Sequence, residues 1–152
     1  MRVIIAAVGR DRTGPFRDLF DEYSARCPWP VRLVEVSARA RLPDERRIAE
    51  EGERLLQAVP PGAVVLALDE RGQELDSQAF AGRISHWQSE GRRELACLIG
   101  GPDGLAPAVL ERADAILAFG RMTWPHRLVR VMLVEQLYRA AMILAGHPYH
   151  RE

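Results

Sequence analysis

Short apolar runs alternate along the chain with segments in which apolar residues recur every three to four positions. The apolar runs predict buried strands at residues 3–8, 63–68, 95–99 and 115–119. Residues 31–36, where apolar and polar positions alternate, predict a further strand. The other segments have the period of helices: from Phe16 until Pro28, from Asp44 to about Val59, from Asp76 or Ser77 through Trp87, briefly after Pro107, and from about Pro125 to Ala145. Buried strands separated by helices predict an α/β fold, with a mainly parallel sheet of about five strands and helices on both faces.

Polar and glycine-rich stretches predict where these elements begin and end. Asp44 can cap the second helix, because its carboxylate accepts hydrogen bonds from free helix N–H groups. The polar stretch Asp69–Gly72 is expected to turn the chain after the third strand. Gly100–Gly104 holds three Gly and one Pro, so it predicts a loop rather than a helix or a strand.

The last predicted helix is apolar nearly all the way round, unlike a surface helix, which keeps one polar face. Such a helix must be enclosed, and a chain of 152 residues has little material with which to enclose it. We therefore expect this helix to form a homodimer interface as well. Glu135 and Arg139 are four positions apart and can form an ion pair on it.

Composition excludes several kinds of chemistry. All 21 basic residues are Arg, so a P-loop lysine and a lysine Schiff base are both ruled out. The motifs G-x-G-x-x-G, G-x-S-x-G and H-E-x-x-H are absent from the chain, which removes the main support for dinucleotide-binding, serine-hydrolase and zincin functions.

The net charge is zero, but its distribution is uneven. Residues 1–48 carry +3 (ten Arg, seven acidic residues), residues 49–118 carry −6 (six Arg, twelve acidic), and residues 119–152 carry +3 (five Arg, two acidic). If the two ends of the chain meet in space, they form a basic rim on which a phosphate backbone can lie. The alternative is an ordinary solvated surface.

Cysteine and histidine spacing indicates no disulfide framework and no metal site. Cys27 and Cys97 are far apart in the sequence, and two lone thiols suit a reducing compartment. His147 and His150 have an H-x-x-H spacing but no third ligand nearby. No stretch approaches the ~20 apolar residues needed to cross a bilayer. We therefore expect a soluble cytoplasmic protein that binds neither metal nor membrane.

Ligands of open α/β sheets bind at the carboxyl ends of the strands. Three predicted strands end in suitable loops: one beginning at Leu68, the Gly100–Gly104 loop, and Phe119–Trp124. The Gly100–Gly104 loop allows the close backbone approach that a nucleotide-like ligand needs, although it can equally be a tight turn before a helix. Among the histidines, His150 is a candidate base or substrate contact, and His126 can serve either packing or a ligand.

Four motifs closely resemble the ribosomal large-subunit methyltransferase H family. They are Leu98–Leu105, Arg121–His126, Arg130–Arg139 and the terminal His147–Glu152, and their order and spacing match over the whole chain. These bacterial enzymes belong to the SPOUT (trefoil-knot) class and methylate N3 of a pseudouridine in helix 69 of 23S rRNA. Departures are small: Trp124 stands where Phe is usual, Arg121 where Lys is common, and the segment 38–43 is short.

The resemblance implies a single SPOUT domain, residues 1–152, whose C-terminal part is threaded as a deep trefoil knot. It also implies an S-adenosylmethionine-dependent rRNA methyltransferase that acts as a homodimer on the assembled 70S ribosome and needs no metal. The residues that hold the cofactor would be Leu68, Gly100, Phe119, Gly120, Arg121, Met122, Thr123 and Trp124.

The catalytic residues implied by the resemblance lie in the tail, beside the methyl donor of the same or the partner subunit. We expect His150 to act as base or proton relay, Tyr149 to position it, and Arg151 to contact a phosphate or the imide oxygen. Three alternatives remain: a SPOUT methyltransferase with a different RNA target, a non-catalytic ribosome-binding factor, and a nucleotide-sensing α/β module. The terminal motif argues against the first and third alternatives, and the intact loops and tail argue against the second.

Overall fold

The computed structural model describes residues 1–150, with the side chains of residues 1–149. Five strands form one parallel sheet in the order β2-β1-β4-β3-β5. The strands are β1 (Arg2–Val8), β2 (Val31–Val36), β3 (Val64–Glu74), β4 (Glu94–Ile99) and β5 (Ala115–Ala118). The central strand is β4, in which Cys97 lies opposite Ile5 of β1 and Leu66 of β3. The predicted parallel sheet is confirmed.

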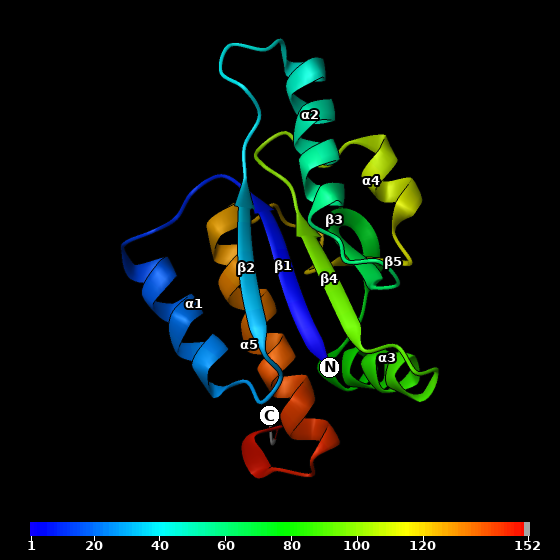
Figure 1. Ribbon diagram of the computed structural model, residues 1–152. Helices are drawn as coiled ribbons and strands as arrows, with labels where there is room; N and C mark the ends of the chain where they lie inside the picture. Colours follow the sequence, from blue (N-terminus) through cyan, green and yellow to red (C-terminus); the bar gives the residue numbers. More distant parts are fainter. Residues whose placement is uncertain (151–152) are drawn as a thin grey trace.

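Helices cover both faces of this sheet (Figure 1). One face carries α1 (Pro15–Arg26), α3 (Ser77–Ser89) and α5 (His126–Leu144), and the other carries α2 (Asp44–Gln57) and α4 (Pro107–Arg112). Along β1, Val3 and Ile5 are buried under the first set of helices, whereas Ala6 and Val8 are buried under the second. Burial on both faces explains why β1, β4 and the first half of β3 are apolar without alternation, whereas the edge strand β2 is only partly buried and includes Arg32 and Glu35. A short 3₁₀ helix, η1 (Pro148–His150), follows α5.

Of the two helices α2 and α3, only α3 begins with a side chain that caps it. Asp76 precedes α3, and its carboxylate accepts a hydrogen bond from the N–H of Ala79 at 2.7 Å, as a capping residue does. The prediction that Asp44 caps α2 is wrong, because Pro43 precedes this helix and Asp44 is its first residue. The carboxylate of Asp44 lies instead in the first turn, where negative charge is favoured by the helix dipole.

The expected turn at Asp69–Gly72 is also wrong, because β3 continues through these residues to Glu74. Leu68 and Gln73 both pair with Leu117 of β5, so the extra residues form an irregularity within the strand. A Cβ at Gly72 would lie 2.7 Å from the backbone of Ile116. A glycine is therefore required for the two strands to remain this close.

The long helix α5 is enclosed mainly by its own chain. It packs on the sheet between α1 and α3 (Figure 1), with Leu133, Val134 and Leu137 fully buried. Leu128, Met132 and Met142 remain partly exposed along one side of the helix. The prediction of an enclosed helix is confirmed, and the homodimer interface stays a prediction. The order of the strands is consistent with the expected trefoil knot.

Candidate functional site

A cavity of about 800 Å³ opens at the carboxyl edge of the sheet, where β3, β4 and β5 end. The three loops singled out from the sequence meet there. Seven of the eight expected cofactor-binding residues line the cavity: Leu68, Gly100, Phe119, Gly120, Met122, Thr123 and Trp124. Arg121 lies in the same loop but is exposed and does not line the cavity.

The Gly100–Gly104 wall of the cavity is folded tightly on itself. The N–H of Gly104 donates a hydrogen bond to the carbonyl of Gly101 at 3.0 Å, and Gly104 has a φ of +85°. A Cβ at Gly100 would lie 2.9 Å from the backbone of Gly104, so a side chain at Gly100 would force the loop open. The loop is thus both a tight turn and a wall of bare backbone, and Asp103 anchors it to α2 through Arg47.

The opposite wall, Phe119–Trp124, is closed by its own side chains. The indole Nε1–H of Trp124 donates to the carbonyl of Phe119 at 2.9 Å, and the hydroxyl of Thr123 donates to Glu70 of β3 at 3.2 Å. Met122 is 76% exposed and Trp124 40% exposed at the mouth of the cavity. Exposed apolar side chains around a concave site are typical of a ligand-binding cavity.

The extended end of β3 brings an ionised carboxylate to the cavity. Asp69 accepts hydrogen bonds from Nε of Arg71 at 2.9 Å and from Nη2 of Arg71 at 3.0 Å. The side-chain hydrogen bonds from Arg71 hold the pKa of Asp69 below its usual value, despite partial burial. Asp69 can therefore accept hydrogen bonds from a ligand hydroxyl or ammonium group at neutral pH.

His126, whose role the sequence left open, lies on the cavity wall as the first residue of α5. Its Nδ1 is buried and has no hydrogen-bond partner among the described residues. Burial, together with the charges of Arg130 and Arg127, lowers the pKa of His126. The imidazole is therefore neutral at pH 7. Its place at the head of a helix following Pro125 was the only sequence signal for this position.

Tyr149 lies away from the cavity of its own chain. Its hydroxyl donates to Oε1 of Glu135 at 3.0 Å, and the guanidinium of Arg139 lies 4.9 Å from the centre of its ring. Nη2 of Arg139 also donates to Glu135 at 2.6 Å, which confirms the predicted ion pair. Burial and the bond to Glu135 raise the pKa of Tyr149 to about 12.

The tail and the cavity are thus at opposite ends of α5 (Figure 1). The 19 residues of α5 span about 28 Å, with His126 at the cavity end and η1 beyond the other end. A single chain therefore does not bring Tyr149 to its own cavity. Arg151 and the side chain of His150 lie outside the described residues.

The described part of the chain shows neither a metal site nor a membrane-spanning helix. Among those residues, no three His, Cys, Asp or Glu side chains gather as metal ligands would. No helix of residues 1–150 is long and apolar enough to cross a membrane.

Comparison with known proteins gives consistent matches over the whole chain. The family model described as "Predicted SPOUT methyltransferase" matches residues 1–150. The ribosomal RNA large subunit methyltransferase H of Rhodospirillum centenum is 59% identical over 151 residues, covering 99% of both chains.

Among solved structures, a probable methyltransferase from Bordetella pertussis Tohama I superposes with a TM-score of 0.62 at 18% identity, covering 92% of this chain and 96% of that one. A ribosomal RNA small subunit methyltransferase E from Neisseria gonorrhoeae bound to S-adenosyl methionine gives a TM-score of 0.53 at 13% identity, covering 95% of this chain and 66% of that one. At these identities the structures show a shared fold alone. The match to the family model and the identity to the methyltransferase H relative show that the chain belongs to the SPOUT methyltransferase family, in the group of the ribosomal RNA large subunit methyltransferase H proteins.

Proposed function

We infer that the protein methylates large-subunit ribosomal RNA with S-adenosylmethionine as the methyl donor, acting as one SPOUT domain over residues 1–152. The acceptor we propose is N3 of a pseudouridine in helix 69 of 23S rRNA, within the assembled 70S ribosome in the cytoplasm. The observation that carries this proposal is the cavity at the carboxyl edge of the sheet, walled by the Gly100–Gly104 and Phe119–Trp124 loops. The shared name of its close relatives supports the rRNA substrate.

The cavity fits the methyl donor in size and in chemistry. Its volume of about 800 Å³ is in the range of cavities that enclose a ligand of this size. Leu68, Leu117 and Val129 supply apolar surface for an adenine ring, and the bare backbone at Gly100 lets that ring come close. Asp69 is placed to accept from hydroxyl groups. The residues that we propose to hold the donor are those of the sequence prediction, and all of them except Arg121 line the cavity.

The donor supplies a methyl group that is already electrophilic, because it is bonded to a positively charged sulfur. The residues of this chain have two remaining tasks: to align the acceptor nitrogen with that methyl group, and to remove or stabilise the imide proton. We propose His150 as the base or proton relay and Arg151 as a contact to a phosphate or the imide oxygen. Tyr149 stays protonated at neutral pH because its pKa is raised to about 12. Tyr149 therefore suits a positioning role and not that of a base.

We further propose that the active form is a homodimer in which one subunit's tail completes the other's cavity. Supporting this, the end of α5 that carries Tyr149 is about a helix length from the cavity of the same chain. The partly exposed side of α5, with Leu128, Met132 and Met142, provides apolar surface for a second copy.

Transfer of labelled methyl groups to three substrates tests the proposal: 70S ribosomes from a strain lacking this enzyme, isolated 50S subunits, and naked 23S rRNA. We expect label on 70S ribosomes at the helix 69 pseudouridine. Label at another position would support methyl transfer to rRNA but contradict the proposed target nucleotide. Cofactor binding without transfer to any of the three would favour a non-catalytic ribosome-binding factor.

A further inference from the structure

Seven arginines have guanidinium groups that make no hydrogen bond or ion pair with any described residue, and all seven are exposed. They are Arg10, Arg12, Arg32, Arg41, Arg46, Arg93 and Arg121. Most other arginines of the described chain are paired with acidic side chains, as Arg17 is with Asp21. An exposed guanidinium group that forms no ion pair within the described chain can bind an anion from outside it.

Five of these seven lie at the carboxyl edge of the sheet, where the cavity opens. Arg10 and Arg12 follow β1, Arg41 follows β2, Arg46 lies in the first turn of α2, and Arg121 follows β5. We call the first four the arginine edge. Arg32, within β2, and Arg93, immediately before β4, lie elsewhere on the sheet.

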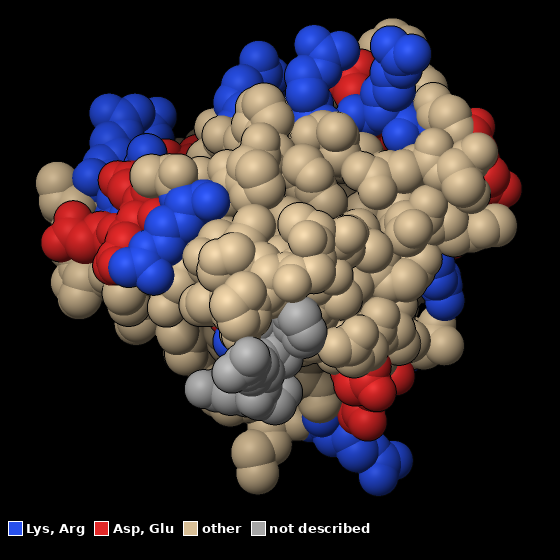
Figure 2. Space-filling view, turned by 90° about the horizontal axis from the view of Figure 1, so that it is seen from below, with Lys and Arg blue, Asp and Glu red and all other residues tan. Residues whose placement is uncertain are grey.

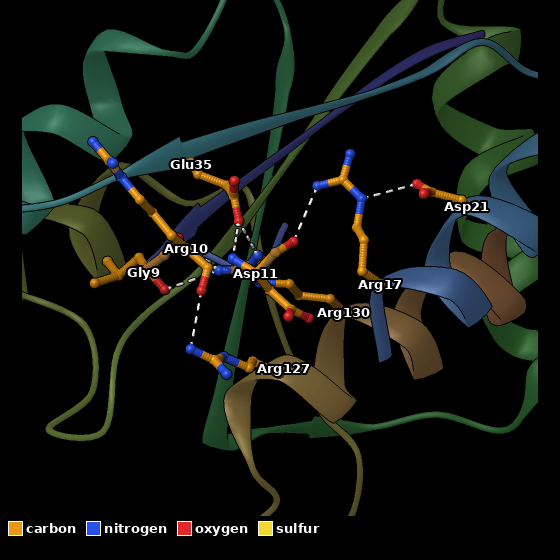
Figure 3. A network of polar contacts seen from close by, with 9 residues as sticks. Gly9, Arg10, Asp11, Arg17, Asp21, Glu35, Arg127 and Arg130 are labelled. Atoms are coloured by element: carbon orange, nitrogen blue, oxygen red, sulfur yellow. Dashed lines mark hydrogen bonds and ion pairs between the residues drawn. The ribbon is translucent and has the colours of Figure 1, made fainter. Parts of the chain in front are cut away.

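The backbone of the loop that carries Arg10 and Arg12 is held by hydrogen bonds from a buried arginine. Arg130 of α5 is 2% exposed, and it donates to Glu35 at 2.7 Å and to the carbonyls of Val8 and Gly9 at 3.1 and 3.0 Å. Glu35 in turn accepts a hydrogen bond from the N–H of Asp11 at 2.6 Å. This network fixes the backbone on either side of Arg10 (Figure 3).

Two more guanidinium groups donate hydrogen bonds to the backbone of the same loop. Arg127 donates to the carbonyl of Arg10 at 3.0 Å, and Arg17 donates to the carbonyl of Asp11 at 3.2 Å. The side chain of Arg10 itself points away from the network (Figure 3). A cation carried on a fixed backbone loses less conformational entropy when it binds a ligand.

The arginine edge adjoins the cavity on two sides. Gly9, next to Arg10, lies against His126 of the cavity wall, since a Cβ at Gly9 would be 3.4 Å from Cε1 of His126. Arg46 is the neighbour of Arg47, which pairs with Asp103 of the Gly100–Gly104 loop. A polyanion bound along this edge would therefore pass beside the mouth of the cavity.

Only two of the seven, Arg32 and Arg93, lie toward the opposite end of the sheet, near the starts of β2 and β4. Figure 2 views that end, where the charged side chains lie around the periphery of a largely uncharged centre. Unpaired positive charge is thus concentrated at one edge, beside the cavity.

We propose that the arginine edge binds the phosphate backbone of the RNA that flanks the methylated nucleotide. The guanidinium group suits this role because it binds phosphate oxygens in a bidentate manner and keeps its charge at every physiological pH. Contacts of this kind fix the register of the RNA without reading its sequence. The inference rests on the proposed function, because it names the partner of the same site.

Paired alanine variants test this inference: Arg10→Ala with Arg12→Ala, and Arg41→Ala with Arg46→Ala. The matched control is Arg32→Ala with Arg93→Ala, which removes the same charge from two arginines that are also exposed and unpaired but lie away from the edge. Binding to 70S ribosomes and to naked 23S rRNA is measured across a series of KCl concentrations, together with single-turnover methyl transfer to 70S ribosomes.

For each edge pair we expect the RNA affinity to fall about tenfold, with the slope of log K against log [salt] smaller by about 1 for each arginine removed. Affinity for S-adenosylmethionine and the transfer rate at saturating ribosome should stay as in the unsubstituted protein. The control pair should keep the full slope. Double Lys variants of the edge pairs should restore most of the slope, because a phosphate contact requires mainly the charge.

Equal affinities and slopes for the edge and control variants would overturn the inference. Because binding is measured apart from transfer, edge-dependent RNA binding without any methyl transfer would refute the proposed function and leave this inference standing.

Discussion

Replacing Glu35 by Gln keeps the shape of the side chain and removes the carboxylate that pairs with the buried cation Arg130. One oxygen of Glu35 accepts hydrogen bonds from Arg130 at 2.7 Å and from the N–H of Asp11 at 2.6 Å. Hydrogen bonds to a charged group contribute about 1.5–3 kcal/mol each, against about 1 kcal/mol for neutral ones. Breaking a buried ion pair costs about 3–5 kcal/mol. Since an amide still accepts both bonds, we expect Glu35→Gln to destabilise the fold by about 3 kcal/mol.

The matched control is Glu22→Gln. Glu22 accepts from Arg26 at 2.7 Å, the same distance, but the side chains of this pair are 51% and 50% exposed, against 16% and 3% for Glu35 and Arg130. Solvent screens an exposed pair, so its loss should cost less than about 1 kcal/mol. Thermal unfolding separates the two variants, because a loss of about 3 kcal/mol lowers the Tm of a chain this size by about 10 °C.

A double-mutant cycle assigns the loss to the ion pair. In an Arg130→Met background the buried cation is gone, so Glu35→Gln should cost less than about 1 kcal/mol there, leaving a coupling energy of about 2 kcal/mol. If Glu35→Gln lowers Tm no more than Glu22→Gln does, or if its cost is unchanged in the Arg130→Met background, then the ion pair does not stabilise this loop.

The same pair makes stability depend on pH. Burial alone would raise the pKa of Glu35, but the hydrogen bonds from Arg130 and the Asp11 amide, with the charges of Arg130 and Arg17, lower it below 4.5. A carboxyl group whose pKa is lower in the folded state contributes stability that is fully present above its unfolded pKa. That stability is lost as the pH falls through the folded pKa. The difference between the unsubstituted protein and Glu35→Gln should therefore be constant at neutral pH and shrink below about pH 4.5.

Three further predictions concern β3 and the cavity. Gly72→Ala places a Cβ 2.7 Å from the Ile116 backbone and should lower the free energy of unfolding by about 2 kcal/mol. Gly82→Ala in α3 adds a Cβ that meets nothing within 4 Å, so it should raise the free energy of unfolding by up to about 1 kcal/mol. Urea denaturation measures both changes. Trp124→Ala removes the bond to Phe119 and should weaken S-adenosylmethionine binding about tenfold by calorimetry without unfolding the protein; unchanged affinity would contradict the cavity assignment. Because the pKa of His126 is lowered, His126→Asn should gain stability relative to the unsubstituted protein as the pH falls below about 6.5, and parallel pH–stability curves would disprove this.

The alternation of apolar runs and helical periods was enough to predict the sheet. Residues 31–36 form β2 with the predicted boundaries, and the other strands begin or end within a residue or two of the runs, apart from β3. The polar residues Asp69–Gly72 failed as a turn signal because the exposed end of a strand tolerates charge when a neighbouring strand supplies its hydrogen bonds. That neighbour, β5, is more than forty residues away in the sequence, and local pattern carries no information about it.

The location of the site was predictable from one rule, namely that ligands of open α/β sheets bind where parallel strands end. That rule predicts that Leu68, Gly100 and Phe119 lie close together, and all three line the cavity. The network around Arg130 was not predictable in the same way. Arg130 lies among apolar residues on the helix, and its partner Glu35 is 95 positions earlier in the chain, so neither residue signals the other.

The helix α5 links the parts of the proposed mechanism. Its first turn supplies His126 to the cavity, its second turn supplies the buried Arg130 that fixes the loop of Arg10 and Arg12, and its far end holds Tyr149 through Glu135. The proposed cofactor and RNA contacts thus belong to one end of the helix and the tail to the other, about 28 Å away. If the tail takes part in transfer, as we propose, the helix is too long for one chain to complete its own site. Cofactor binding then needs one subunit and methyl transfer needs two.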